Sequence, residues 1–353
     1  MTRQDRIAAL KAAARERILI LDGAWGVMIQ QRDLSEADFR GGRFEDHPGQ
    51  LKGNNDLLCL TRPDIVGDLH ESYYAAGADI SQTNTFSSTA IAQADYGMEG
   101  AVRDINLAGA RIARQVADRW TEEQPGKPRF VAGAIGPLNR MLSMSSDVGD
   151  PGARTVTFEE VYRAYREQVI ALHEGGVDIF LIETITDTLN CKAAIKAILD
   201  IQDEGYEPLP IWISGTITDL SGRTLSGQTV EAFWNSVRHA RPFAIGLNCA
   251  LGADLMRPYI ADLARVADTL VSAYPNAGLP NAMGQYDERP EQTSHELHEW
   301  AEHGLVNILG GCCGTTPEHI AHVAAAVQGL APRQVPERPK ALRLAGLEPF
   351  ELA

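Results

Sequence analysis

The sequence predicts an α/β protein folded as one (β/α)8 barrel, and two observations support this prediction. Eight short apolar runs recur along the 353 residues, and segments with a helical pattern separate them. Each run is almost continuously apolar, which is typical of strands buried on both faces of a parallel sheet. A doubly wound open sheet is the alternative, but it normally contains fewer strand–helix units, so the barrel is favoured.

The apolar runs are rich in β-branched residues, and each ends in Gly, Asn, Thr or Ser. The predicted strands begin, in order, at Ile18, Ala78, Arg129, Val177, Pro210, Phe243, Leu270 and Val306. Residues 157–176 carry apolar side chains at every third or fourth position and end in glycine, so they predict a helix. Residues 316–330 predict another, with Thr316 as its N-cap and Pro317 at the first helical position.

Two segments fall outside the regular alternation. Residues 24–62 interrupt the first strand–helix unit, and we expect this insertion to cover the barrel mouth. Residues 331–353 contain four prolines and predict an extended C-terminal tail. The expected division is therefore a barrel over residues 1–330 followed by a tail.

The charge balance excludes several classes of partner. The chain has 32 Lys and Arg against 47 Asp and Glu, a formal net charge of −15, which would repel nucleic acid and anionic membranes. No apolar run is long enough for a membrane span, and the N-terminus does not resemble a signal peptide. Five cysteines do not form the pattern of a disulfide scaffold. We expect a cytoplasmic protein with reduced thiols.

In a (β/α)8 barrel the active site lies at the carboxyl ends of the strands. The polar residues predicted at these ends are Asp22, Asn84, Glu183, Thr216, Asn248, Cys249, Asn276, Cys312 and Cys313. Three of the five cysteines therefore converge on one rim, from the sixth and eighth strands. The other two, Cys59 in the insertion and Cys191 on a helix, are expected to be simply buried.

Three thiolates in a small space suit zinc, and three protein ligands leave an open position, as catalytic zinc sites do. Glycines beside Cys312 and Cys313 would let both sulfurs turn the same way. The alternative is that the adjacent pair are small core residues and Cys249 is incidental. A metal with three thiolates activates water poorly but holds an added thiol as thiolate, which favours alkyl transfer to sulfur.

Other strand-end residues fit an amino-acid thiol as the substrate. Asp22 and Glu183 could bind its ammonium group, and the backbone amides and hydroxyls of Ser214, Gly215 and Thr216 could bind its carboxylate. Either acid could instead cap a helix or pair with an arginine.

Several motifs in order resemble a known family. They are "LDGAWGVMIQ", "GNNDLLCLTRPDIV", "GADISQTNTFSSTAIAQADYGM", "VAGAIGP", "ETITDTLNCKAAI", "AYPNAGLPN" and "GGCCGTTPEHI". From about residue 10 to 330 the chain resembles the homocysteine-binding module of cobalamin-dependent methionine synthase, within the wider homocysteine S-methyltransferase family. The "GNNDLL" and "AYPNAGLPN" stretches resemble methionine synthase more than the betaine- or S-methylmethionine-dependent branches.

The resemblance implies a zinc-bearing barrel that binds homocysteine thiolate and methylates it to methionine. Zinc would lie on Cys249, Cys312 and Cys313, with Asn276 as a fourth ligand when substrate is absent. Asp22 and Glu183 would hold the substrate amino group.

The sequence lacks the cobalamin signature Asp-x-His-x-x-Gly, and the nearest string, "DLHESY" at Asp68, has no glycine in the required place. Methylcobalamin would therefore be supplied in trans by a separate subunit that binds cobalamin and folate. The tail "LAGLEPFELA" is similar to the segment that leads into the folate module. Two alternatives stay open: a stand-alone enzyme using S-methylmethionine, S-adenosylmethionine or betaine, and a non-catalytic zinc- or thiol-binding protein.

Overall fold

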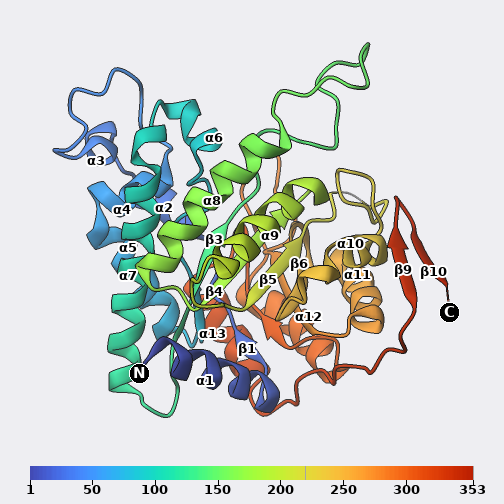
Figure 1. Cartoon of the computed structure of the whole chain (residues 1–353). Helices are drawn as coiled ribbons and strands as arrows, with labels where there is room; N and C mark the ends of the chain where they lie inside the picture. Colours follow the sequence, from blue (N-terminus) through green and yellow to red (C-terminus); the bar gives the residue numbers. More distant parts are fainter. Residues whose placement is uncertain (219, 353) are drawn as a thin grey trace.

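The computed structural model describes residues 1–218 and 220–352, and within them eight parallel strands form a barrel surrounded by helices (Figure 1). The strands follow the order β1-β8-β7-β6-β5-β4-β3-β2, and a parallel bridge between Leu21 and Ile80 links the first strand to the second. This arrangement confirms the predicted (β/α)8 fold, because all the predicted strands contribute one strand each.

The strands are β1 (Leu19–Ile20), β2 (Ile80–Gln82), β3 (Phe130–Ile135), β4 (Ile179–Ile185), β5 (Ile211–Gly215), β6 (Ala244–Gly252), β7 (Leu270–Asn276) and β8 (Ile308–Leu309). The helices that follow them are α5 (Pro63–Ala75), α7 (Val102–Glu123), α8 (Phe158–Gly175), α9 (Thr188–Asp203), α10 (Val230–Val237), α11 (Ala253–Val266), α12 (Pro290–Glu302) and α13 (Pro317–Ala326). Short elements in the connections are α2 (Trp25–Gln30), α3 (Glu36–Arg40), α4 (Leu58–Thr61), α6 (Ala90–Gln93) and the 3₁₀ turns Asn55–Leu57, Ala94–Tyr96, Glu99–Ala101 and Arg238–Ala240.

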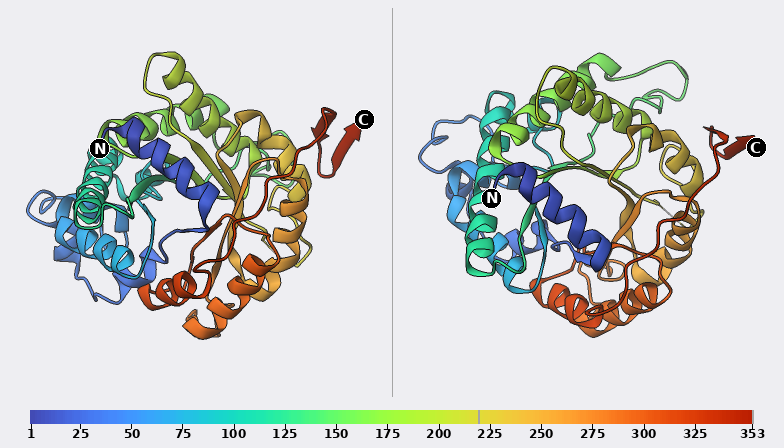
Figure 2. Two further views of the ribbon diagram at one scale, coloured as in Figure 1. Left: turned by 90° about the horizontal axis from the view of Figure 1, so that it is seen from below. Right: turned by 60° about the horizontal axis from the view of Figure 1, so that its bottom comes forward.

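Helix α1 (Arg3–Glu16) closes the N-terminal end of the barrel, and Figure 2 shows it lying across that end. Thr2 caps the helix by accepting a hydrogen bond from the backbone N–H of Asp5. Leu10 and Ala14 on its buried face pack against inward-pointing strand residues such as Trp212. Burying these side chains excludes water from the barrel interior, which leaves the opposite end as the entrance.

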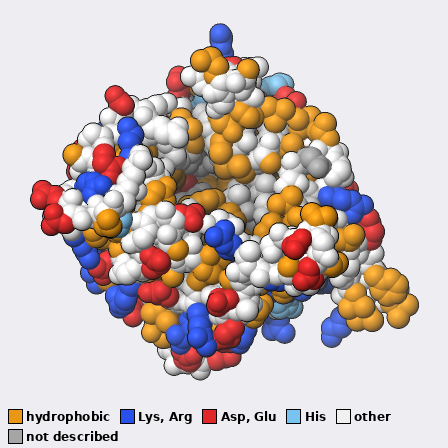
Figure 3. Space-filling view, turned by 90° about the horizontal axis from the view of Figure 1, so that it is seen from above, with side chains coloured by type: hydrophobic (Ala, Val, Ile, Leu, Met, Phe, Trp, Pro, Cys, Tyr) orange, Lys and Arg blue, Asp and Glu red, His pale blue; other side chains and the backbone are white. Residues whose placement is uncertain are grey.

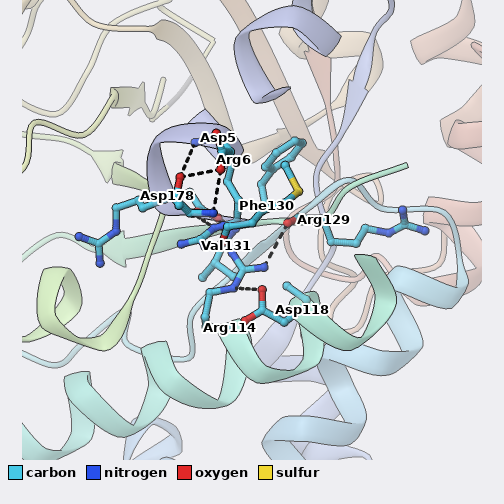
Figure 4. A network of polar contacts seen from close by, with 12 residues as sticks. Asp5, Arg6, Arg114, Asp118, Arg129, Phe130, Val131 and Asp178 are labelled. Atoms are coloured by element: carbon cyan, nitrogen blue, oxygen red, sulfur yellow. Dashed lines mark hydrogen bonds and ion pairs between the residues drawn. The ribbon is translucent and has the colours of Figure 1, made fainter. Parts of the chain in front are cut away.

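Two buried aspartates at this N-terminal end are paired with arginines. Asp178 accepts hydrogen bonds from Arg6 Nε at 2.7 Å and Arg114 Nη1 at 2.6 Å (Figure 4). Asp79 accepts two from Arg17, at 2.7 and 2.8 Å. The same carboxylates accept the backbone N–H groups of Val131 and Ile20, so each ion pair also ties neighbouring strands together.

The predicted insertion, residues 24–62, forms a small core of its own beside the barrel. Its α2, α3 and α4 bury apolar side chains such as Phe39 and Leu58 against Leu69 of α5 and Ile105 of α7. Two parts of it, residues 24–27 and 53–56, line the cavity at the carboxyl ends of the strands.

The two helices predicted over residues 157–176 and 316–330 are both present, with small differences at their ends. α8 begins after its N-cap Thr157 and stops at Gly176, whose φ of +100° ends the helix. α13 begins at Pro317 as predicted but ends at Ala326, four residues before the expected position. Turns follow the helix up to Leu330. Within them Gly329 has a φ of +82°, which lies outside the α-helical range.

The C-terminal segment is extended only in its first half. Arg333 fixes it to the barrel by donating to the backbone carbonyls of Ala264, Ala267 and Thr269. The chain then forms an antiparallel hairpin of β9 (Leu342–Ala345) and β10 (Pro349–Leu352) beside α10, which the sequence analysis did not anticipate. In the described part of the chain no helix is both long and apolar enough to cross a membrane.

Candidate metal centre and active site

The three cysteines predicted at the strand ends meet in the structure. The sulfurs of Cys249, Cys312 and Cys313 all lie within 4.8 Å of one another, and Cys249 and Cys313 are 3.8 Å apart. Two thiolates on one tetrahedral zinc, at about 2.3 Å from the metal, lie at roughly this separation. The donor set and its spacing therefore fit a metal ion with three sulfur ligands, and all three side chains are partly exposed.

Unusual backbone geometry brings these sulfurs together. Cys249 and Ala250 have φ values of +61° and +59°, and the pairing of β6 with β7 shifts register between Asn248 and Gly252. In the loop after β8, Gly314 has a φ of +82°, and a Cβ at this position would lie 2.3 Å from Tyr286 Cβ. Only glycine fits there, so the predicted need for glycine beside the cysteine pair has a steric cause.

The pKa values of the cysteine thiols are shifted in opposite directions. Hydrogen bonds from Cys249, Cys312 and Tyr286 lower the pKa of Cys313 to about 3. The hydrogen bond with Cys249 is also the main reason that the pKa of Cys312 is raised. The cluster thus holds one stabilised negative charge, which favours cation binding.

Two asparagines hold the cluster in place. Asn276 Oδ1 accepts a hydrogen bond from the backbone N–H of Cys313 at 3.1 Å, so this side chain positions the cysteine loop. Its role as a fourth metal ligand stays a prediction. Asn248 Nδ2 lies 3.9 Å from Cys312 Sγ and also donates to Thr184 Oγ1 at 2.8 Å. Its Oδ1 accepts the N–H of Thr184, which stabilises the strained φ of +56° beside Glu183.

The sulfurs open into a cavity of about 490 Å³ at the carboxyl ends of the strands. Figure 3 shows this face of the molecule and its central hollow. The side chains that line the cavity include Trp25, Asp56, Gln82, Phe86, Tyr96, Glu183, Tyr274 and Tyr286. No lysine, arginine or histidine lines it among the residues that the structure describes.

Asp22 lies fully buried at the end of β1, next to the cavity. Its Oδ2 accepts hydrogen bonds from Ser81 Oγ at 2.7 Å, the Gln82 N–H at 2.8 Å and Trp25 Nε1 at 3.0 Å. All three donors are neutral. Burial raises the pKa of Asp22 to about 7, because these hydrogen bonds only partly replace the lost hydration.

Glu183 lines the cavity at the end of β4 and is 3% exposed. The Gln82 amide nitrogen, with the amide turned towards it, lies 2.9 and 3.1 Å from the two carboxylate oxygens. Burial, together with the nearby charge of Asp22, raises the pKa of Glu183 to about 8. Gln82 contacts both acids, Asp22 through its backbone N–H and Glu183 through its amide side chain, so the two carboxylates lie close together. Their role in binding an ammonium group stays a prediction.

Several residues of this cavity were missed by the sequence analysis, and Asp56 and Tyr286 are the two that bear most on its chemistry. Asp56 is a third buried acid, and its Oδ2 accepts hydrogen bonds from Ser87 N–H and Ser88 Oγ, both at 2.6 Å. Burial raises its pKa to about 6. Its position inside "GNNDLL" was the available signal. Tyr286, from the loop after β7, had no such signal, because nothing local to an irregular loop predicts what it will contact.

Ser214, Gly215 and Thr216, the predicted carboxylate contacts, lie beside the cavity, and their binding role stays a prediction. None of them lines the cavity. Ser214 Oγ donates to Asn248 Oδ1 at 2.7 Å, and Thr216 Oγ1 donates to the Asn248 carbonyl at 3.0 Å, while a Cβ on Gly215 would meet Phe233 at 2.7 Å. The hydroxyls of Ser214 and Thr216 thus hold β5 against β6.

The two remaining cysteines are buried away from the cluster, as expected. Cys59 is 2% exposed and its Sγ donates to the Asn84 carbonyl at 3.3 Å. Cys191 is fully buried in α9. Burial raises the pKa of both thiols, so neither is a ready metal ligand.

Comparison with known proteins gives the family. A family model described as homocysteine S-methyltransferase matches residues 19–327, which include the cysteine cluster, Asp22 and Glu183. The chain belongs to the homocysteine S-methyltransferase family. It is therefore a methyltransferase of this family, whose methyl acceptor is homocysteine.

Solved structures show the same fold. The metallated form of the homocysteine methyltransferase MmuM from Escherichia coli is 22% identical, with a TM-score of 0.70 over 90% of this chain and 98% of that chain. The oxidized form of the same protein is 22% identical, with a TM-score of 0.69 over 87% of this chain and 95% of that chain. At this identity the likeness establishes the architecture of the barrel.

Proposed function

We propose that this chain is a zinc-dependent homocysteine S-methyltransferase whose methyl donor is methylcobalamin, carried by a separate cobalamin- and folate-binding subunit of methionine synthase. One observation carries the acceptor side of the proposal: three clustered sulfurs and buried acids without a cationic partner meet at one cavity. Homocysteine has the complementary groups, a thiol and an ammonium. The donor side rests on the sequence motifs that resemble methionine synthase.

Cys249, Cys312 and Cys313 would hold the zinc ion, and their donor atoms fit it in type and spacing. When bound, zinc would favour the thiolate form of an added thiol at neutral pH. The crystallised MmuM protein has a metallated form, which is consistent with metal binding in this family.

Asp22 and Glu183 would accept hydrogen bonds from the substrate ammonium. Burial raises the pKa of both carboxyl groups, and no lysine, arginine or histidine lines the cavity beside them among the described residues. An arriving ammonium supplies the missing charge, so it would stabilise both carboxylates in their ionised form. With the ammonium fixed there, the substrate sulfur is directed to the cysteine side of the same cavity and accepts the methyl group there, giving methionine.

Metal analysis with homocysteine titration tests the metal assignment. We expect one zinc per chain in the wild type and loss of zinc in Cys312→Ser. Cys191→Ser is the matched control, because Cys191 is a buried cysteine outside the cluster, and it should keep the metal. Full zinc occupancy in Cys312→Ser would contradict the assignment.

A donor assay tests the source of the methyl group. Methionine formation is measured with methylcobalamin on a partner protein, and separately with S-methylmethionine, S-adenosylmethionine and betaine without cobalamin. Robust turnover of the chain alone with one of these small donors would overturn the proposed cobalamin partner while leaving the acceptor site intact.

X-ray absorption distinguishes the catalytic site from a structural one. In the proposed site, homocysteine adds one sulfur to the three protein sulfurs around zinc. A fourth protein ligand that persists when homocysteine is added would favour a non-catalytic zinc protein. A cytoplasmic location and the division of the chain near residue 330 remain predictions.

A further inference from the structure

A histidine outside the cavity is connected to Asp22 through one serine. His70 lies on the inner face of α5 and is fully buried. Its Nδ1 is 2.7 Å from Ser81 Oγ, and Ser81 Oγ is 2.7 Å from Asp22 Oδ2. The His70 ring also packs edge-on against Trp25, with ring centroids 4.6 Å apart, and Trp25 donates to the same Asp22 oxygen.

The protons in this chain of contacts can be assigned. Ser81 has one hydroxyl proton, and when Asp22 is ionised that proton must point to Asp22. Nδ1 of His70 must then carry a proton and donate it to Ser81. Burial lowers the pKa of His70 to about 3, so the ring is neutral and Nε2 holds a lone pair.

The surroundings of Nε2 agree with this assignment. Nε2 is buried and has no hydrogen-bond partner among the described residues. A buried N–H without an acceptor is more costly than a buried lone pair without a donor, so the Nδ1–H tautomer is the better one here. If Asp22 were protonated and donated to Ser81, the proton order would reverse and Nε2–H would be the orphaned group. The tautomer of His70 and the ionised form of Asp22 therefore support each other.

We propose that His70 is a positioning residue for ammonium recognition: as the Nδ1–H tautomer it directs the Ser81 hydroxyl at Asp22 and keeps that carboxylate ionised and oriented for the substrate amino group. The inference rests on the proposed function, because it assumes that Asp22 contacts the ammonium. His70 is not among the residues that line the cavity, so the lining alone would not identify it.

The test compares two ligands that differ only in the amino group, homocysteine and 4-mercaptobutanoate, by calorimetric titration of the zinc-loaded protein. The wild type should bind homocysteine more tightly. In His70→Leu the advantage of homocysteine should fall by up to roughly tenfold, the upper end of what one hydrogen bond between neutral groups contributes, while 4-mercaptobutanoate binds as before. His70→Asn should restore the advantage in part, because its amide nitrogen can donate from nearly the same place as Nδ1.

Three outcomes separate the inference from the proposed function. If the wild type does not prefer homocysteine, the proposed binding of its ammonium group at Asp22 and Glu183 is contradicted. If the wild type does prefer it and His70→Leu keeps the full preference, the role of His70 is overturned. His173→Leu is the matched control, since His173 is a buried histidine on α8 that contacts Arg3 and the Glu207 carbonyl, and it should leave the preference unchanged.

Nitrogen-15 spectra of the histidine rings give a second test, read from the wild-type protein itself. A neutral ring protonated at Nδ1 is expected for His70 in the homocysteine complex, with His70→Asn used to assign its signals. A ring protonated at Nε2 in that complex would overturn the inference.

Discussion

Buried acids lie at both ends of the barrel, but they have different partners. At the N-terminal end, Asp79 and Asp178 are paired with arginines. At the C-terminal end, Asp22, Asp56 and Glu183 accept hydrogen bonds from neutral groups only, within the described part of the chain. A buried carboxylate without a cation weakens the folded state, so we infer that a cation would arrive with the ligand. On this proposal the acids of the first end serve stability and those of the second serve binding.

The largest effect is expected at the N-terminal end. Asp178→Asn removes the charge that Arg6 and Arg114 share and leaves both guanidinium groups near an uncharged amide. The free energy of unfolding should fall by about 3–5 kcal/mol, as when one partner of a buried pair is removed. Urea denaturation measures it. Unchanged homocysteine affinity in the folded fraction would show that the two ends are independent, and a stability loss below 1 kcal/mol would contradict the comparison.

The same kind of substitution at the C-terminal end should affect binding instead. Glu183→Gln preserves the shape of the side chain but removes an ionisable group that has no arginine or lysine partner among the described residues. We expect affinity for homocysteine to weaken about 10- to 100-fold, from losing a charge-assisted hydrogen bond, with stability equal to or above wild type. Titration with homocysteine and urea denaturation, run side by side, measure both. A stability loss as large as that of Asp178→Asn would show that Glu183 is structural.

The pH dependence of stability sharpens the comparison. Burial raises the pKa of Glu183 from about 4.5 to about 8, so between these values the folded protein holds a proton that the unfolded chain has released. The free energy of unfolding of the ligand-free protein should therefore fall as the pH rises through this window. Asp22, with a pKa of about 7, acts in the same direction.

Ligand binding should respond to pH in the opposite way. The ammonium needs ionised carboxylates, so homocysteine affinity relative to 4-mercaptobutanoate should rise by up to about tenfold per pH unit from pH 6 to 8. Glu183→Gln should flatten both profiles in part. Stability that rises steadily with pH over this range in the wild type would contradict the raised pKa values.

The smallest effect is expected at the surface. Arg163 and Glu159 form an exposed ion pair on α8, with side chains that are 75% and 58% exposed. Arg163→Ala should change the free energy of unfolding by less than about 0.5 kcal/mol, because water and salt screen such pairs. Arg163→Ala serves as a reference for Asp178→Asn. A comparable loss in the free energy of unfolding in both variants would mean that burial of Asp178 contributes little.

Most of the fold could be predicted because its signals are local. Continuous apolar runs mark the strands, and periodic segments with capping residues such as Thr157 mark the helices. Active sites of (β/α)8 barrels lie at the carboxyl ends of the strands, and this rule predicted that Cys249 lies near Cys312 and Cys313 before any distance was known. The C-terminal hairpin was missed because its two strands are only four residues long, and the prolines of the segment indicated an extended tail instead.

The differences between the predicted and the observed surroundings of the site share one cause. Ser214 and Thr216 lie at a strand end, as a binding residue would, yet their hydroxyls contact Asn248. Asp56 and Tyr286 lie in irregular connections and still reach the cavity. Position along a strand predicts the end of the barrel where a side chain lies, but not which neighbour takes its hydrogen bond.

The sequence by itself determined the barrel, the rim that carries the chemistry and the three cysteines on it, because strand formation and strand direction depend on patterns within a few residues. Only the tertiary structure decided which buried acids are paired with an arginine and which are not. Arg114 reaches Asp178 across 64 positions, and the Asp22 carboxylate meets Ser81 across 59 and Ser81 meets His70. These contacts depend on distances between strands and helices brought together by the closed barrel, and no local pattern encodes them.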